Sequence, residues 1–227
     1  RDHTVGDPRS RSVTYTAPVT QVGPGTPAGT LLRRHWIPVA VAADLADQQG
    51  PDALTLALVA KQVGVATPSL YKHVGGRDDL VARIADATVR DLGAVLEQAT
   101  AGRPADQALH HAAWALRSFA HERPAAFRLV FQPGAEATRA DAEVSAAAVA
   151  PLLRTARDLV GEGDALAAAR TVTAWASGFL SMELADAFRM GGDVDEAFAF
   201  GVETLVSALR LRGDAAVGRS PAVGAGG

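Results

Sequence analysis

Residues 55–80 constrain the fold of this chain more than any other stretch of it. Apolar residues recur at helical spacing after Thr55, whose hydroxyl is suited to accept a free amide hydrogen at a helix start. Gly64 is suited to end that helix. Thr67 and Pro68 indicate a second helix, with Thr67 as its cap and Pro68 as its first residue. The pattern predicts two short helices joined by a tight turn.

The second of these helices is expected to run from Pro68 to about Val74, and its inner face has only Leu70 and Val74 to bury. A helix this short is marginal by itself, so another element must hold it, and its polar side must face water or a partner. Two short helices joined by a glycine-containing turn form a helix-turn-helix, whose second helix lies in the major groove of DNA. The sequence therefore predicts a DNA-binding head, followed after Gly75 and Gly76 by a third helix.

Candidate DNA contacts follow from the chemistry of the second helix and its flanks. Lysine reaches guanine acceptors or phosphate, serine and threonine donate to phosphate or bases, and Pro68 and the Tyr71 ring can touch a thymine methyl group. The alternatives are that Tyr71 is a helix-packing aromatic residue and that His73 is a structural histidine. The predicted DNA-binding residues are Thr55, Thr67, Pro68, Ser69, Tyr71, Lys72, His73 and Arg77.

Short motifs run through this region: Leu54-Thr55-Leu56, Val59-Ala60, Gly64-Val65, Ser69-Leu70-Tyr71-Lys72-His73-Val74 and Asp79-Leu80. Together they resemble the DNA-binding domain of the TetR family of transcriptional repressors. The resemblance implies an all-helical homodimer that binds a DNA operator and releases it when a small molecule enters the C-terminal domain. It also implies a phosphate contact for Arg77, whereas Ala57 stands where relatives often carry a longer side chain that contacts a base.

The composition favours a helical protein with a substantial core. The chain has 227 residues, of which 48% are hydrophobic, enough to bury a core in one large or two small domains. Abundant alanine and scarce β-branched runs favour helix throughout, so the expected fold class is all-α. Cysteine is absent, which excludes disulfides and thiolate chemistry. Because no apolar run is long enough to span a bilayer and no signal-peptide core is found, a soluble, cytoplasmic protein is expected.

Charge is unevenly distributed along the chain, whose formal net charge is −3. Residues 31–90 contain seven Lys and Arg against six acids, whereas residues 91–212 contain sixteen acids against eleven bases. A nucleic-acid-binding protein normally carries a basic footprint, so any DNA contact here must be local. The basic residues available to the head are Arg33, Arg34, Lys61, Lys72 and Arg77, and the alternative is that they are ordinary solvated charges.

Proline and glycine positions divide the chain into segments. Residues 1–30 contain four prolines and no sustained period, so they are expected to form a flexible arm that either follows DNA phosphates or is inert. Residues 31–76 are the predicted helix-turn-helix domain, with a first helix near residues 38–49, and residues 77–212 are the predicted ligand-binding and dimerisation domain. Helices are expected in that domain at residues 77–100, 104–121, 124–131, 137–160, 164–190 and 194–211, before a mobile tail at 213–227.

A second motif, Thr173-Ala174-Trp175-Ala176-Ser177-Gly178-Phe179, continues through Met182-Glu183-Leu184 to Gly192-Asp193. It resembles the C-terminal domain of TetR-type regulators that are named for a Trp-His-Gly motif. This chain departs from that motif, because Ser177 stands where the motif carries histidine.

Aromatic and polar side chains at three- and four-residue spacings are candidates for the lining of a ligand cavity. The expected effector is an apolar or aromatic small molecule. The alternative is that all of these side chains belong to the core. The predicted ligand-binding residues are His110, Trp114, Phe127, Phe131, Trp175, Phe179 and Met182.

Two apolar stripes near the C-terminal end are candidates for a dimer interface. Two such helices from each of two chains would form a four-helix bundle about a twofold axis. The first stripe consists of Leu166, Ala169, Val172, Ala176 and Phe179, and the second of Val194, Phe198, Val202, Leu205 and Leu209.

The sequence contains no constellation typical of an enzyme. His110 and His111 point about 100° apart on a helix and do not converge on a metal, and Gly-rich phosphate loops and a G-x-S-x-G elbow are absent. Neither a cofactor nor a metal is expected. The sequence favours a homodimeric helix-turn-helix regulator, a repressor released from a palindromic operator by a small molecule. The alternative is an all-helical enzyme or small-molecule-binding protein with a vestigial DNA-binding head.

Overall fold

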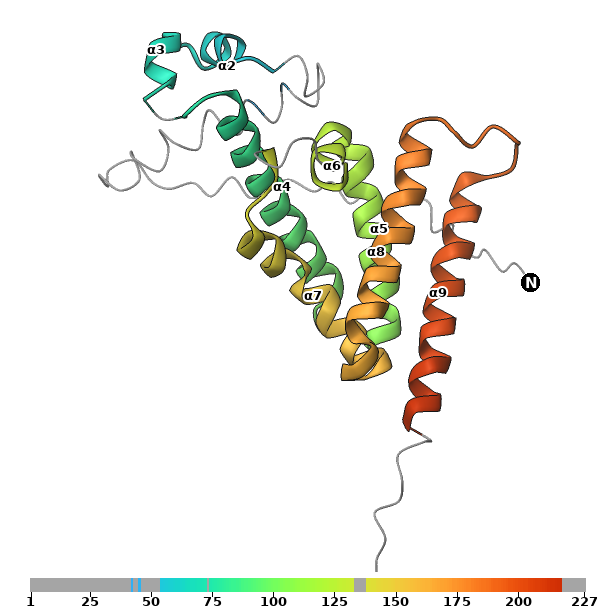
Figure 1. Ribbon diagram of the computed structural model, residues 1–227. Coiled ribbons are helices and arrows are strands. Elements are labelled where there is room, and N and C mark those ends of the chain that lie inside the picture. Colours follow the sequence, from blue (N-terminus) through green and yellow to red (C-terminus); the bar gives the residue numbers. More distant parts are fainter. Residues whose placement is uncertain (1–41, 43–44, 46–53, 73, 133–137, 218–227) are drawn as a thin grey trace, which may run out of the picture.

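A computed structural model describes residues 42, 45, 54–72, 74–132 and 138–217 of the chain (Figure 1). Every element in this part is a helix, which confirms the predicted all-α class. None of these helices is long and apolar enough to cross a lipid bilayer. The elements are α2 (Leu56–Val63), α3 (Thr67–Leu70), α4 (Arg77–Thr100), α5 (Ala105–Glu122), α6 (Pro124–Phe131), α7 (Ala142–Val160), α8 (Glu162–Leu184) and α9 (Val194–Val217).

Two predictions for the N-terminal part lie largely outside the described residues. The arm predicted at residues 1–30 is one of them, and most of the helix predicted near residues 38–49 is the other. Ala42 and Leu45 of that helix are described, and both are helical and buried in the core of the head.

Helix α2 begins and ends as predicted, but α3 starts differently. The Thr55 hydroxyl caps α2 by accepting a hydrogen bond from the Leu58 amide at 3.2 Å, and Gly64 ends the helix with a left-handed φ of 78°. At α3, Ala66 holds the extended cap position and Thr67 is already helical. The predicted cap at Thr67 is therefore wrong, because the chain enters the helix one residue earlier than Thr67-Pro68 suggested.

Helix α3 is also shorter than predicted. The Tyr71 amide reaches the Thr67 carbonyl at a long 3.4 Å, and the chain then continues as a turn in which the Val74 amide bonds to the Leu70 carbonyl at 3.0 Å. Leu70 and Val74 are buried nonetheless, in one core with residues of α2 and α4. Tertiary packing, rather than helix length, holds this segment in place.

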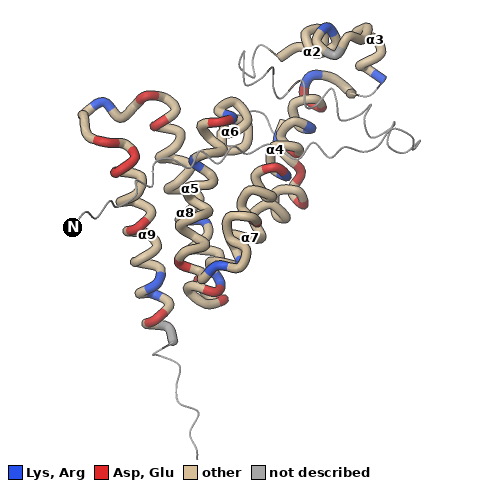
Figure 2. The backbone as a smooth tube through the Cα atoms, turned by 180° about the vertical axis from the view of Figure 1, so that it is seen from behind, with Lys and Arg blue, Asp and Glu red and all other residues tan. Residues whose placement is uncertain are grey.

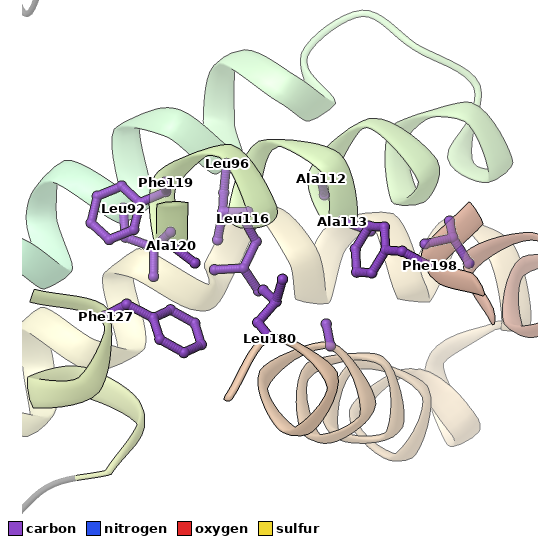
Figure 3. Packing of buried hydrophobic residues seen from close by; sticks show 12 residues of the cluster. Leu92, Leu96, Ala112, Ala113, Leu116, Phe119, Ala120, Phe127, Leu180 and Phe198 are labelled. Carbon is purple, nitrogen blue, oxygen red and sulfur yellow. The ribbon is translucent and has the colours of Figure 1, made fainter. Parts of the chain in front are cut away.

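Helix α4 has the predicted bounds and connects the head to the body, which consists of the second half of α4 and helices α5 to α9 (Figure 1). Its first half contributes Leu80, Val81 and Ile84 to the core of the head. Its second half contributes Leu92 and Leu96 to the main core of the body, beside side chains of α5 (Figure 3). One continuous helix therefore links the head to the body, and Leu129 of α6 adds a contact with the core of the head.

Helices α7 and α8 have boundaries that differ from the prediction. Helix α7 starts at residue 142 rather than 137, because Asp141 caps it by accepting from the amides of Glu143 and Val144 at 2.8 and 3.3 Å. Helix α8 ends at Leu184 rather than at 190, and Asp186 then takes a left-handed φ of 51°. The turn between α8 and α9 therefore runs over residues 185–193, whereas the prediction left only residues 191–193 between the two helices.

Helix α9 is longer than predicted, so residues 213–217 belong to it rather than to a tail. The reason lies at Gly213, where a Cβ would stand 2.0 Å from the Leu159 carbonyl oxygen of α7. This glycine lets two helices approach closely instead of ending one of them. At its other end α9 is capped by Asp193, which accepts from the amides of Asp195 and Glu196 at 2.7 and 3.3 Å.

A charged cluster joins α5, α8 and α9. Arg117 of α5 donates from Nε to both carboxylate oxygens of Glu183, at 3.2 and 3.1 Å, and from Nη2 to Asp195 at 2.6 Å. Its guanidinium carbon also lies 5.4 Å from the centre of the Trp114 ring and 5.1 Å from that of Phe198. The hydrogen bonds to Glu183 raise the pKa of Arg117 against the opposing effect of burial, and Asp195 adds to the increase. The cluster fixes the end of α8 and the start of α9 against α5.

Trp175 of α8 packs directly against the backbone of α9. Its ring stacks on Phe198 with centroids 5.4 Å apart, and its other neighbour is Phe179 at 5.7 Å. A Cβ on Gly201 would lie 2.0 Å from Cζ2 of the indole. Any larger residue at position 201 must therefore displace a ring that is held on both sides.

We expect Gly201→Ala to lower the free energy of unfolding by about 1–3 kcal/mol, because the added methyl group overpacks the contact with Trp175. Gly163→Ala is the matched control, since a Cβ there meets no atom within 4 Å. Urea unfolding of the two variants and the original protein at one protein concentration measures the difference. A loss in Gly163→Ala as large as that in Gly201→Ala would contradict this account of the packing.

Candidate DNA-binding and ligand-binding sites

Helix α3 and the turn after it (residues 67–72) form the recognition segment, which has a buried and an exposed side. Leu70 faces the core of the head, whereas Tyr71 has 58% of its surface exposed. Pro68, Ser69 and Lys72 are exposed as well. The exposure of Tyr71 contradicts the alternative interpretation in which its ring packs between helices. The outer side thus presents a phenol, a hydroxyl and an ammonium group, which are groups that contact bases and phosphates in protein–DNA complexes.

The remaining predicted DNA contacts are placed differently. The Thr55 hydroxyl is engaged as the cap of α2, and Thr67 is half-buried in the first turn of α3. Arg77 donates from Nε to the Leu54 carbonyl at 3.1 Å, so it ties the start of α4 to the residue before the α2 cap. His73 lies outside the described residues. Their contacts with DNA stay predictions, and two of these side chains have a structural task as well.

Asp79 holds the turn that leads from α3 into α4. Its Oδ2 accepts from the Gly75 amide at 2.7 Å, and its Oδ1 accepts from Nε of Arg83 at 3.0 Å. The hydrogen bond from Arg83, followed by that from Gly75, lowers the pKa of Asp79 below its usual value. Asp79 is therefore ionised at neutral pH and fixes the direction in which the chain leaves the recognition segment.

The head carries a local positive charge although the chain as a whole is acidic. Between residues 54 and 77 the sequence contains Lys61, Lys72 and Arg77 and no acidic residue. Asp78 and Asp79 follow at the start of α4, and further acidic positions lie on the body, several of them at the turn between α8 and α9 (Figure 2). This distribution supplies the local basic surface that a DNA contact requires.

The body contains an apolar cavity of about 250 Å³. Helices α4 to α8 all contribute to its wall, whereas none of its described lining residues comes from α9. Because α4 forms part of the wall, the cavity touches the helix that carries the head. The lining residues are Val89, Leu92, Leu96, Ala112, Ala113, Leu116, Val130, Phe131, Ser145, Ala148, Val149, Leu152, Val172, Thr173 and Ala176.

Of the predicted ligand-binding residues, only Phe131 lines this cavity. Trp114, Trp175 and Phe179 surround Phe198 instead, with ring centroids 5.1, 5.4 and 5.2 Å from that of Phe198. They are partly buried and pack with Phe198 against the core of the body, which fits the alternative interpretation for these three residues. The sequence did not reveal the lining residues, because alanine and aliphatic residues recur at helical spacing on any buried helix face. That pattern does not distinguish a face that lines a cavity from one that packs against a neighbouring helix.

The other predicted ligand-binding residues are spread over the body. Phe127 is fully buried against Phe131, Met182 is exposed, and His110 lines a separate polar groove with residues of α9. Within the described part of the chain, no group of three His, Asp or Glu side chains is placed to hold a metal ion.

Five of the ten residues predicted for the dimer interface are buried inside the body, and Leu166 is the one that is exposed. Phe198, Val202 and Ala176 are at most 2% exposed, so they cannot reach a partner. Each helix carries a second stripe that faces solvent, and Phe200 is its largest member at 73% exposed. The exposed stripes consist of Ala174, Gly178 and Met182 on α8 and of Phe200, Thr204 and Leu211 on α9.

Two family models match the chain. Residues 39–84 match the bacterial regulatory proteins of the tetR family, and residues 109–205 match a Tetracyclin repressor-like C-terminal domain. The chain belongs to the TetR family. The first match covers the head, and the second runs from α5 into α9 across the body that holds the cavity.

Several known proteins are similar to this TetR-family chain. Rv0681 of Mycobacterium tuberculosis, an uncharacterized HTH-type transcriptional regulator, is 38% identical over 78 residues, which are 34% of this chain and 36% of that protein. YobS of Bacillus subtilis, another such regulator, is 26% identical over 173 residues, or 76% of this chain and 91% of that protein. The crystal structure of Mycobacterium smegmatis BioQ is 28% identical and covers 78% of this chain and 97% of its own, with a TM-score of 0.57.

The second TetR-type motif of the sequence lies on α8. The Ser177 hydroxyl donates to the Ala174 carbonyl at 3.2 Å, and the Ser177 carbonyl accepts from the Ser181 hydroxyl at 2.7 Å. These bonds remain within one helix, and Trp175 and Phe179 of the same motif are partly buried against the core of the body. The resemblance to Trp-His-Gly regulators stays a prediction, because the family model that matches here is the Tetracyclin repressor-like one.

Proposed function

We propose that this protein is a transcriptional repressor that binds a palindromic DNA operator as a homodimer and releases it when a small molecule occupies the body. The observation that carries the proposal is the recognition segment, where buried Leu70 anchors exposed Tyr71 and Lys72 at an outer surface. The relationship to BioQ supports it, because BioQ has been solved with its natural double-stranded DNA operator. A DNA-binding regulator acts where the DNA lies, so we place the protein in the cytoplasm.

The proposal assigns no enzymatic role. Both matching family models describe regulators, and both HTH-type relatives are transcriptional regulators. These comparisons support a regulator over the all-helical enzyme with a vestigial head that the sequence alone left open.

A dimer follows from the small size of the recognition segment. One segment of this length makes few base contacts, so useful affinity requires two heads in successive major grooves, about 34–36 Å apart. The exposed stripes of α8 and α9 are the surface we assign to the partner. Phe200 supplies apolar area there. A Cβ added at Gly178 would meet no atom within 4 Å, so this glycine leaves room for a second helix to approach closely.

Regulation would act through α4. Val89, Leu92 and Leu96 of this helix line the cavity, and Leu80 and Ile84 of the same helix lie in the core of the head. A molecule that fits the cavity better in one position of α4 shifts the population toward that position. Two heads at the wrong separation no longer match successive grooves, and the operator is released.

Lys72→Ala is expected to weaken operator binding to a similar degree across sequences, and to reduce the slope of log affinity against log salt by about 1 for each head, hence about 2 for the dimer. Tyr71→Ala should cost about 1–3 kcal/mol and depend on the operator sequence. Gel shifts at several salt concentrations, with the DNA that flanks the gene, measure both effects. Arg157→Ala, which removes an exposed cation from the end of α7 and leaves α4 untouched, is the matched control. Unchanged affinity in both head variants would refute the recognition segment.

Phe200→Glu should dissociate the dimer and weaken operator binding with it, because a charge would replace an apolar ring in the proposed interface. Ser118→Glu adds the same charge at an exposed position of α5 and should change neither property. Sedimentation velocity and gel shifts on the same preparations test the prediction. A dimer that survives Phe200→Glu unchanged would place the interface elsewhere.

A further inference from the structure

The chemistry of the cavity wall restricts what the cavity can hold. Thirteen of its fifteen lining residues are apolar, and the other two are Ser145 and Thr173. No charged side chain is among these lining residues. An ion placed there would lose its hydration without gaining a counter-charge, which is strongly unfavourable.

The two polar residues of the wall have free hydroxyl groups. Several other hydroxyls of the body bond to a carbonyl of their own helix, as Thr155 does to Pro151 at 3.0 Å and Thr171 does to Ala167 at 2.8 Å. The hydroxyls of Ser145 and Thr173 form no such bond with any group in the described part of the chain. Both are therefore available to a molecule inside the cavity.

The size and the opening of the cavity further limit which molecules it can bind. An apolar cavity of about 150 Å³ in another protein binds benzene, so about 250 Å³ suits a molecule of one or two rings. Val149 lines the cavity and is 48% exposed, so the cavity opens to solvent at the N-terminal half of α7.

We infer that the cavity binds a compact, uncharged, mainly hydrocarbon molecule with one hydrogen-bonding oxygen, such as an alcohol, phenol, ketone or ester, which Ser145 and Thr173 contact. This inference rests on the proposed function only in naming that molecule as the effector. Binding in the cavity and release of the operator are separate measurements, so each can fail without the other.

The probes are 2-naphthol, its hydrocarbon parent naphthalene, 2-naphthoate and 2-naphthylmethylammonium. Calorimetric titration at pH 7 should give binding of 2-naphthol, and affinities for the two ions that are lower by about tenfold or more. Binding of 2-naphthol should also raise the melting temperature of the protein. Equal affinity for either ion, or no binding of 2-naphthol, would overturn the inference.

Thr173→Val keeps the shape of the side chain and removes its hydroxyl, so it should weaken 2-naphthol binding by roughly threefold to tenfold. Naphthalene has no hydrogen-bonding group, so its affinity should not fall. Thr171→Val is the matched control, because that hydroxyl is two residues away on α8, bonds to its own helix and lies outside the cavity wall. Ser145→Ala provides the same test from α7.

The outcomes separate the two claims. If Thr173→Val and Ser145→Ala leave 2-naphthol binding unchanged, or weaken it no more than Thr171→Val does, the assignment of the hydroxyl contacts is wrong. If 2-naphthol binds as described and a gel shift shows the operator still bound, the inference on the cavity stands and the proposed ligand response fails.

Discussion

Helix α4 belongs to two hydrophobic cores at once, and every functional interpretation of this protein depends on that fact. Ile84 is buried among residues of the head, while Leu92 and Leu96 are buried in the body and also line its cavity. Side chains in close-packed cores do not move independently, because a shift at one contact must be accommodated by the next. A change at the cavity wall can therefore reach the head through α4. Helix α6 adds a second contact, because Leu129 packs against the core of the head while Val130 and Phe131 line the cavity.

The body uses its two sides for different tasks. Around Phe198, aromatic rings and the ion pair of Arg117 with Glu183 join α5, α8 and α9 into a packed unit. The cavity lies on the other side, among α4 to α8, and its described wall includes no residue of α9. Helix α9 is thus free to present Phe200 at the surface. Ligand binding and dimer contact can then use one body without competing for the same side chains.

Local signals predicted much of the fold from the sequence. The Thr55 cap, the Gly64 stop and the proline that opens α6 act within a few residues, so the bounds of α2, α4 and α6 were predicted to within a residue. The end of α9 was predicted at residue 211, six residues before its true end at Val217. Gly213 makes a close contact with α7 instead of ending the helix, and such a contact depends on tertiary structure. The cavity was unpredictable for the same reason: Trp175 looked like a ligand contact, while the alanines that form the wall looked like ordinary core.

The central claim is that occupying the cavity changes the separation of the two heads through α4. Since the chain has no cysteine, Gln62→Cys places one spin label on the exposed surface of each α2, and pulsed electron paramagnetic resonance measures the distance between the two labels. The distances should be narrowly distributed with operator DNA and should shift when 2-naphthol saturates the DNA-free protein. An unchanged distribution under conditions where the same ligand releases the operator would contradict the account.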